Sequence, residues 1–165
     1  LVCNPSLGVK NLNELIAKSK ATPLSYASGG AGVPGHLSTE LLLNMTGMQM
    51  THIPYKGPAP AMQDVLAGQV PCGLLAGPTV LPHVKSGKLT ALAVSGHGRS
   101  PTLPEVPTID EAAVKGFVYT PWYGFWFPAG VAPGLPLVQS MEKSQDSNHP
   151  ISLQEPGSRL IFRLP

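Results

Sequence analysis

The sequence lacks any run of about 18 consecutive apolar residues, so it predicts no membrane-spanning helix. Charge is also scarce, because only 12% of the 165 residues are charged and 11 basic against 9 acidic side chains leave a net charge of +2. With so small a charge and scattered basic residues, we expect no nucleic-acid partner. No Gly-x-Ser-x-Gly motif is present, and no two carboxyl side chains form a close pair with apolar flanks. The chain is therefore not expected to be an enzyme.

Cysteine is rare, with Cys3 and Cys72 as the two examples. Both lie in apolar, strand-like runs, which favours two buried free thiols over the alternative of a disulfide between them. The five histidines have no metal-ligand spacing with one another or with cysteine. His36 and Glu40 stand four residues apart and would supply at most two ligands. We therefore expect neither a metal ion nor a cofactor.

Glycine and proline are abundant, at 18 and 19 residues, and predict many turns and short elements. A hydrophobic content of 42% favours one globular domain over a disordered chain. Short apolar runs alternate with helical patterns, which predicts an α/β fold in which helices flank a sheet of mainly parallel strands. Strands are expected at residues 1–4, 24–27, 50–53, 70–75, 89–94 and 119–127, with helices after Asn11, from about His36 to Gly47, at 59–67 and 78–85, and after Thr108.

Local signals support the first two helices. Asn11 and Glu14 have the spacing of a capping box, in which the side chain of each residue accepts a hydrogen bond from the backbone N–H of the other. Leu37, Leu41 and Met45 repeat at helical spacing, which indicates a helix that Gly47 would end.

The most informative segment is YASGGAGVPGHL at residues 26–37, where a strand runs into a glycine-rich loop and then a helix. This order places free backbone N–H groups at a helix N-terminus and favours a small anion such as a carboxylate. Gly30, Gly32 and Gly35 also match the dinucleotide pattern Gly-x-Gly-x-x-Gly. Pro34, and the absence of an acidic residue about twenty positions later, count against a nucleotide. A nucleotide-binding enzyme domain and a purely structural turn remain the alternatives.

The aromatic residues concentrate at positions 119–127. We interpret this run as a strand buried on both faces, and the alternative is an aromatic wall of a cleft or a contact with a second domain. From about Pro136 the sequence is polar and without periodicity, so we expect a loosely ordered tail.

Several segments together carry a family resemblance. Besides residues 26–37 they include HIPYKG at 52–57, LAGQV at 66–70, LPHVKSGKL at 81–89, ALAV at 91–94, PEVPT at 104–108, and WYG and PAG at 122–124 and 128–130. In this order and spacing they resemble the periplasmic solute-binding proteins of tripartite tricarboxylate transporters, the Bug family. The resemblance extends from residue 1 to about residue 133.

The resemblance implies a periplasmic-binding-protein-like fold of type II, in which two lobes close on a small carboxylate that is then delivered to membrane permease subunits. Residues 1–117 would form the second lobe, 118–135 a crossover strand toward the first lobe, and 136–165 a divergent tail. A monomer in the periplasm is implied. The first lobe's loop would precede residue 1, so we expect a fragment, or a non-functional truncated product, that binds weakly or not detectably. The implied ligand-binding residues are Ser28, Gly29, Gly30, Ala31, Gly32, Val33, His36, Tyr55 and Lys56.

Some residues depart from the family pattern. Relatives often have serine where Val33 and Gly35 stand, so two hydroxyl donors are absent here. The strand expected at 70–75 often ends in Phe-Asp in relatives, whereas this chain has Leu74 and Leu75. These departures leave the identity of the carboxylate open.

Overall fold

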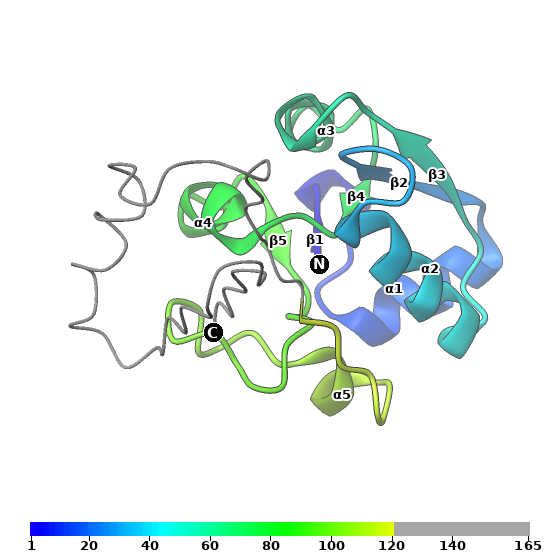
Figure 1. The fold of residues 1–165 in the computed structure, drawn as a ribbon, viewed down its shortest axis with the longest axis vertical. Coiled ribbons are helices and arrows are strands. Elements are labelled where there is room, and N and C mark those ends of the chain that lie inside the picture. Colours follow the sequence, from blue (N-terminus) through cyan, green and yellow to red (C-terminus); the bar gives the residue numbers. More distant parts are fainter. Residues whose placement is uncertain (121–165) are drawn as a thin grey trace, which may run out of the picture. The chain divides into compact units, whose positions relative to one another are not determined.

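The computed structural model describes residues 1–120, so the tail and most of the expected aromatic strand lie outside the described residues. A five-stranded sheet carries helices on its faces, as Figure 1 shows. The elements are β1 (Val2–Cys3), η1 (Pro5–Leu7), α1 (Leu12–Ala21), β2 (Leu24–Ser28), α2 (Pro34–Thr46), β3 (Met50–Pro54), α3 (Pro58–Leu66), β4 (Cys72–Gly73), α4 (Gly77–Lys85), β5 (Thr90–Ala91) and α5 (Ile109–Ala112).

The sheet is mixed, with strand order β3-β2-β4-β1-β5. β2 pairs in parallel with β3 and β4, as expected from the helical crossovers between them. β1 pairs antiparallel to both β4 and β5, which corrects the expectation of mainly parallel pairing. The crossover from β4 through α4 to β5 leaves a gap of one strand, and β1 fills that gap in the opposite direction. β4 and β5 have two residues each and are shorter than the apolar runs at 70–75 and 89–94 predicted.

The core has two parts because neighbouring residues of a strand point to opposite faces of a sheet. Tyr26 and Cys3 pack with side chains of α1 and α2, including Leu12 and Leu42. Their neighbours on the strands, Ala27 and Val2, pack instead with α3 and α4. The described residues contain no helix long and apolar enough to cross a membrane.

Helix boundaries follow local chemistry. The Asn11 side chain accepts a hydrogen bond from the Glu14 amide at 2.9 Å, and the Glu14 carboxylate accepts from the Lys10 amide at 2.8 Å. Gly47 ends α2 with a φ of +67°, a conformation that glycine adopts without strain. The start of α1 at Asn11 and the end of α2 at Gly47 were therefore predicted correctly, whereas the capping box is incomplete because Glu14 bonds to the amide of Lys10 and not of Asn11.

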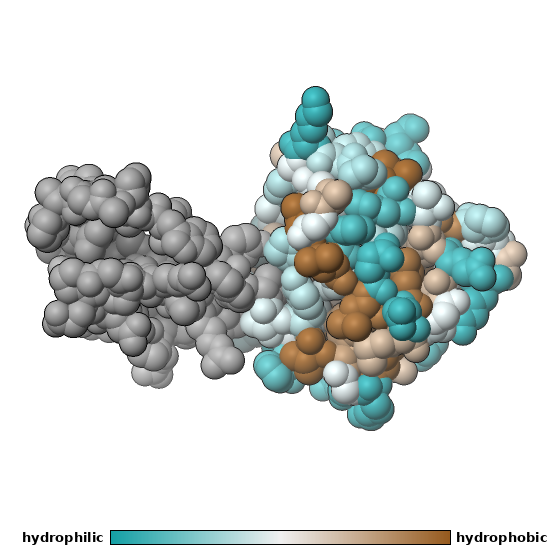
Figure 2. All heavy atoms as spheres, turned by 45° about the vertical axis from the view of Figure 1, so that its right-hand side comes forward, coloured by the Kyte–Doolittle hydropathy of each residue, from teal (hydrophilic) through white to brown (hydrophobic). Residues whose placement is uncertain are grey.

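Helix α2 buries a different face from its most regular apolar repeat. Leu37, Leu41 and Met45 are 51%, 42% and 44% exposed. The buried positions include Ser38 and Thr39, whose hydroxyls donate to the carbonyls of Pro34 and Gly35 and so need no water. Figure 2 shows hydrophobic side chains gathered on one face of the described part of the chain. Helical spacing thus located the helix but not the side that faces the core.

Cys3 and Cys72 form a disulfide, so the expectation of two free thiols was wrong. They are direct partners in the antiparallel β1–β4 pair, with Cα atoms 4.0 Å apart. The sequence conceals this pairing because 69 positions separate the two residues and their contact depends on strand order.

Candidate functional site

Three loops meet at one edge of the sheet. Because β2, β3 and β4 are parallel, the segments that follow Ser28, Pro54 and Gly73 all leave at the same end. The first two are joined directly, since the Tyr55 amide donates to the Ser28 carbonyl at 3.0 Å and the Gly57 amide to the Gly29 carbonyl at 2.9 Å. The glycine loop, residues 28–33, therefore lies beside Tyr55 and Lys56, as the resemblance implied. Such an edge is where ligands bind in open α/β sheets.

The helices that begin at this edge share an unusual feature. The residues that precede α2, α3 and α4 are Val33, Gly57 and Ala76, and no side chain among the described residues caps these helices by a hydrogen bond. Uncapped first turns leave backbone N–H groups available and give the edge a partial positive charge. The other helices within residues 1–120 have side-chain caps, supplied by Asn4 for η1, Asn11 for α1 and Thr108 for α5.

The loop uses some of its own donors. The Gly30 amide donates to Ser28 Oγ at 3.2 Å, and the Gly32 amide donates to His36 Nδ1 at 3.0 Å. The amides of Gly29, Ala31 and Val33 have no hydrogen-bond partner among residues 1–120. Of the implied loop donors, these three are free to meet a ligand.

Ser28 is fully buried, and its hydroxyl is already engaged. It lies 2.8 Å from the Gly30 carbonyl and 2.6 Å from His52 Nε2. A carbonyl can only accept, so the hydroxyl proton goes to Gly30 and His52 Nε2 donates to Ser28. A nucleophilic serine needs the reverse, a histidine that takes its proton.

His52 was not among the residues identified from the sequence. It is the register partner of Tyr26 on the neighbouring strand, and the two rings stack with centroids 5.0 Å apart. It also stacks on His36 at 4.0 Å, which connects β3 to the first turn of α2. Its position two residues before Pro54 in the HIPYKG segment was the signal that could have identified it, once strands β2 and β3 were paired.

Charged and ionisable groups surround this stack. Tyr26 donates its hydroxyl to Glu40 Oε1 at 2.5 Å, and His36 Nε2 lies 3.9 Å from the same oxygen. Burial and then the nearby His36 lower the pKa of His52, while Glu40 acts in the opposite direction. Burial first, and then the bond to Glu40, raise the pKa of Tyr26. Residues 1–120 contain no group of three or more side chains arranged to hold a metal ion.

Tyr55 and Lys56 border the loop in different ways. The Tyr55 hydroxyl donates to Asp64 Oδ2 at 2.5 Å on α3, and this bond raises the pKa of Tyr55 to about 12. Lys56 is exposed, and no ion pair of the described residues includes it. A ligand contact for either residue stays a prediction.

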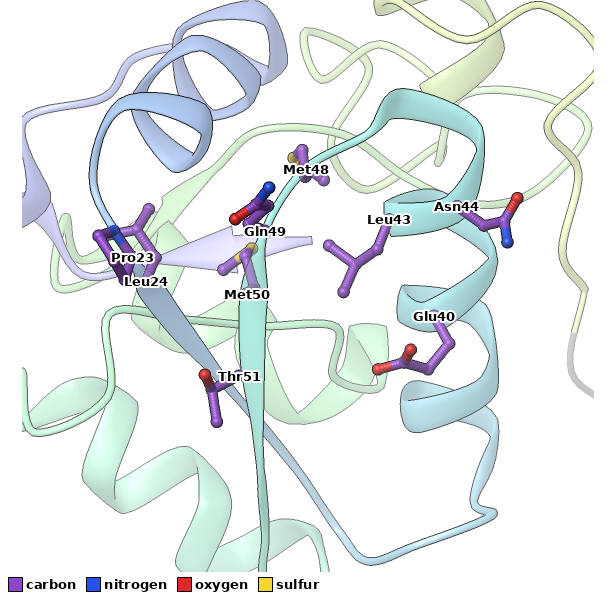
Figure 3. Close-up of a pocket in the computed structure, with 9 residues that line it drawn as sticks. All are labelled: Pro23, Leu24, Glu40, Leu43, Asn44, Met48, Gln49, Met50 and Thr51. Atoms are coloured by element: carbon purple, nitrogen blue, oxygen red, sulfur yellow. The ribbon is translucent and has the colours of Figure 1, made fainter.

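A separate hollow of about 480 Å³ lies where β2 and β3 begin, at the end of these strands opposite to the glycine loop. Figure 3 shows side chains from α2 and β3 around it, with the Glu40 carboxylate among them. Its lining residues are Pro23, Leu24, Glu40, Leu43, Asn44, Met48, Gln49, Met50 and Thr51. None of the implied ligand-binding residues lines this hollow.

Comparison with known sequences identifies relatives over most of the chain. The sequence pattern of the tripartite tricarboxylate transporter family receptor matches residues 1–150. Protein BugT of Bordetella pertussis is 42% identical over 137 residues, which cover 82% of this chain and 42% of BugT. The UPF0065 protein in the gbd 5' region of Cupriavidus necator is 37% identical over 142 residues, or 84% of this chain and 43% of that protein. The chain thus spans less than half the length of these curated relatives.

Solved structures with the same fold are also similar in sequence. The periplasmic binding protein BugD has a TM-score of 0.77 and 35% identity over 86% of this chain and 48% of its own. R. palustris Rpa4515 with adipate has a TM-score of 0.69 and 38% identity over 71% of this chain and 40% of its own. MatC (Rpa3494) from Rhodopseudomonas palustris with bound malate has a TM-score of 0.64 and 26% identity over 71% of this chain and 40% of its own.

Proposed function

Because this chain belongs to the tripartite tricarboxylate transporter receptor family, we propose that it is a carboxylate-binding lobe of a solute-binding protein. The observation that carries the proposal is the convergence of three helices without side-chain caps at one edge of the sheet. Their backbone N–H groups suit a carboxylate, which accepts several hydrogen bonds at once. Similar proteins were solved with adipate and with malate, and both ligands are dicarboxylates.

The ligand's carboxylate is held by the amides of Gly29, Ala31 and Val33 and by the positive end of α2. Ser28 and His36 hold the loop from within, and Tyr55 and Lys56 form its border. In this arrangement the Ser28 hydroxyl donates to the Gly30 carbonyl and supports the loop, which suits a site that binds its ligand. The family relationship supports a transport role in which the loaded protein meets permease subunits.

The periplasm is the compartment that fits this role. The family relationship supports it, and so does the disulfide between Cys3 and Cys72, since disulfides persist in oxidising compartments and are rare in the cytosol. A bacterial periplasm maintains such oxidising conditions.

Amide chemical shifts recorded by NMR at millimolar ligand test the carboxylate site even when binding is weak. Adipate should shift the amides of Gly29, Ala31 and Val33 in a saturable way. Adipamide, which has the same length without charge, should leave them unchanged. Shifts that are equal for the two compounds, or absent from this loop, would contradict the proposal.

The substitution Val33→Pro removes one of these donors. Val33 has a φ of −72°, which proline adopts without strain, and its amide has no partner among residues 1–120. We expect about tenfold weaker adipate binding, the effect of losing one hydrogen bond to a charged group, with little change in the melting temperature. Unchanged affinity would exclude the Val33 amide as a donor. A nicotinamide cofactor serves as the test of the nucleotide alternative and should cause no saturable shift.

A further inference from the structure

Two amides of the glycine loop are held by side chains, and both of these side chains contact His52. The Gly30 amide is held by Ser28, whose hydroxyl also lies 2.6 Å from His52 Nε2. The Gly32 amide is held by Nδ1 of His36, whose ring stacks on His52. His52 belongs to β3, so a neighbouring strand supports two positions of the loop that follows β2.

The hydrogen bonds define the protonation of the stacked rings. Nδ1 of His36 accepts from the Gly32 amide, so it carries no proton, and the neutral ring holds its proton at Nε2. His52 donates from Nε2 to Ser28, because the serine proton is directed to the Gly30 carbonyl. The arrangement therefore requires one tautomer of each ring and a neutral His36.

We propose that His52 is a positioning residue of the carboxylate site, which supports the glycine loop at Gly30 and Gly32 through Ser28 and His36. The inference rests on the proposed function, since the geometry of the loop matters for capture only where the loop binds the ligand. His52 itself does not contact the ligand. It places the amide of Ala31, which lies between Gly30 and Gly32, and the amide of Val33, which follows Gly32.

The loop needs such support because its own backbone is irregular. Gly30 and Gly32 have φ values of +145° and +76°, outside the range that other residues commonly adopt. Glycine at these positions permits the conformation without favouring it, so contacts from neighbouring elements must select it. The stack and the serine bond are the side-chain contacts that do so among the described residues.

Two further groups contact the stacked histidines. The groups that face the pair are Glu40 on α2, 3.9 Å from His36 Nε2, and Tyr26 on β2, stacked on His52. The lowered pKa of His52 agrees with a neutral stack.

Two substitutions separate the two contacts of His52. His52→Phe keeps an aromatic ring for His36 but loses the donor to Ser28, so hydrogen exchange of the Gly30 amide should accelerate about fivefold while the Gly32 amide changes little. His52→Gln keeps a donor near the position of Nε2 but loses the ring, so the Gly32 amide should accelerate instead. His97→Gln, at an exposed histidine outside the network, is the matched control and should change neither amide.

Exchange is measured by NMR without ligand at pH 7, so its outcome is independent of the adipate titration. Equal acceleration at both amides in both variants, or acceleration throughout the sheet, would mean that His52 only supports the fold and would overturn the inference. Failure of adipate to shift the loop would instead overturn the proposed function.

Discussion

The double variant Cys3→Ala with Cys72→Ala is expected to unfold with a free energy about 4 kcal/mol lower than that of the unsubstituted chain. The disulfide closes a loop across a sequence separation of 69, and a cross-link of this span removes entropy from the unfolded chain by roughly that amount. It also joins β1 to β4 in the centre of the sheet, where both residues are fully buried. Urea denaturation followed by circular dichroism measures the difference.

The unsubstituted chain under a strong reductant is the control, because it loses the cross-link and keeps the sulfur atoms in the core. Its unfolding free energy should fall nearly as far as that of the double variant. The single variant Cys3→Ala should match the double variant closely, since one cysteine cannot form the bond. A loss below about 1 kcal/mol in all three cases would show that the disulfide does not contribute through the unfolded state.

The second large effect is expected from Gly35→Ala in the first turn of α2. A Cβ atom at this position would collide with the carbonyl oxygen of Leu74, which directly follows β4. Because the obstructing atom belongs to the backbone and not to a flexible side chain, α2 or the segment after β4 must shift. We expect a loss of about 3 kcal/mol in the free energy of unfolding, at the upper end of the range for overpacking.

Gly77→Ala is the matched control for this substitution. Gly77 also lies in the first turn of a helix, α4, and a Cβ there meets no atom within 4 Å. The change should be neutral or stabilising by up to about 1 kcal/mol, because alanine restricts the unfolded chain. Similar unfolding free energies for the two variants would contradict the close approach of α2 to β4.

Patterns that depend on a few consecutive residues predicted the structure well. Asn11 caps α1 and Gly47 ends α2, because caps and helix ends are decided within one turn of chain. The glycine loop was located correctly between β2 and α2 for the same reason.

Features that depend on strand order were not predictable in the same way. The Cys3–Cys72 bond and the Tyr26–His52–His36 stack both require knowledge of which strands are neighbours. The buried face of α2 was missed because Ser38 and Thr39 look like surface residues until their hydroxyls are seen to bond to the backbone of their own helix. The family resemblance predicted that the glycine loop binds the ligand, whereas His52 was identified only from the three-dimensional contacts.

The three uncapped helix starts have a consequence for how such a site changes during evolution. A backbone N–H group is present in every residue type except proline, so most substitutions in the loop preserve the donors while they alter the surrounding shape. A residue other than valine at position 33 thus keeps the amide there, unless that residue is proline. If the proposed site binds a carboxylate, substitutions of this kind would change the shape of the pocket around the ligand while the backbone donors stay in place.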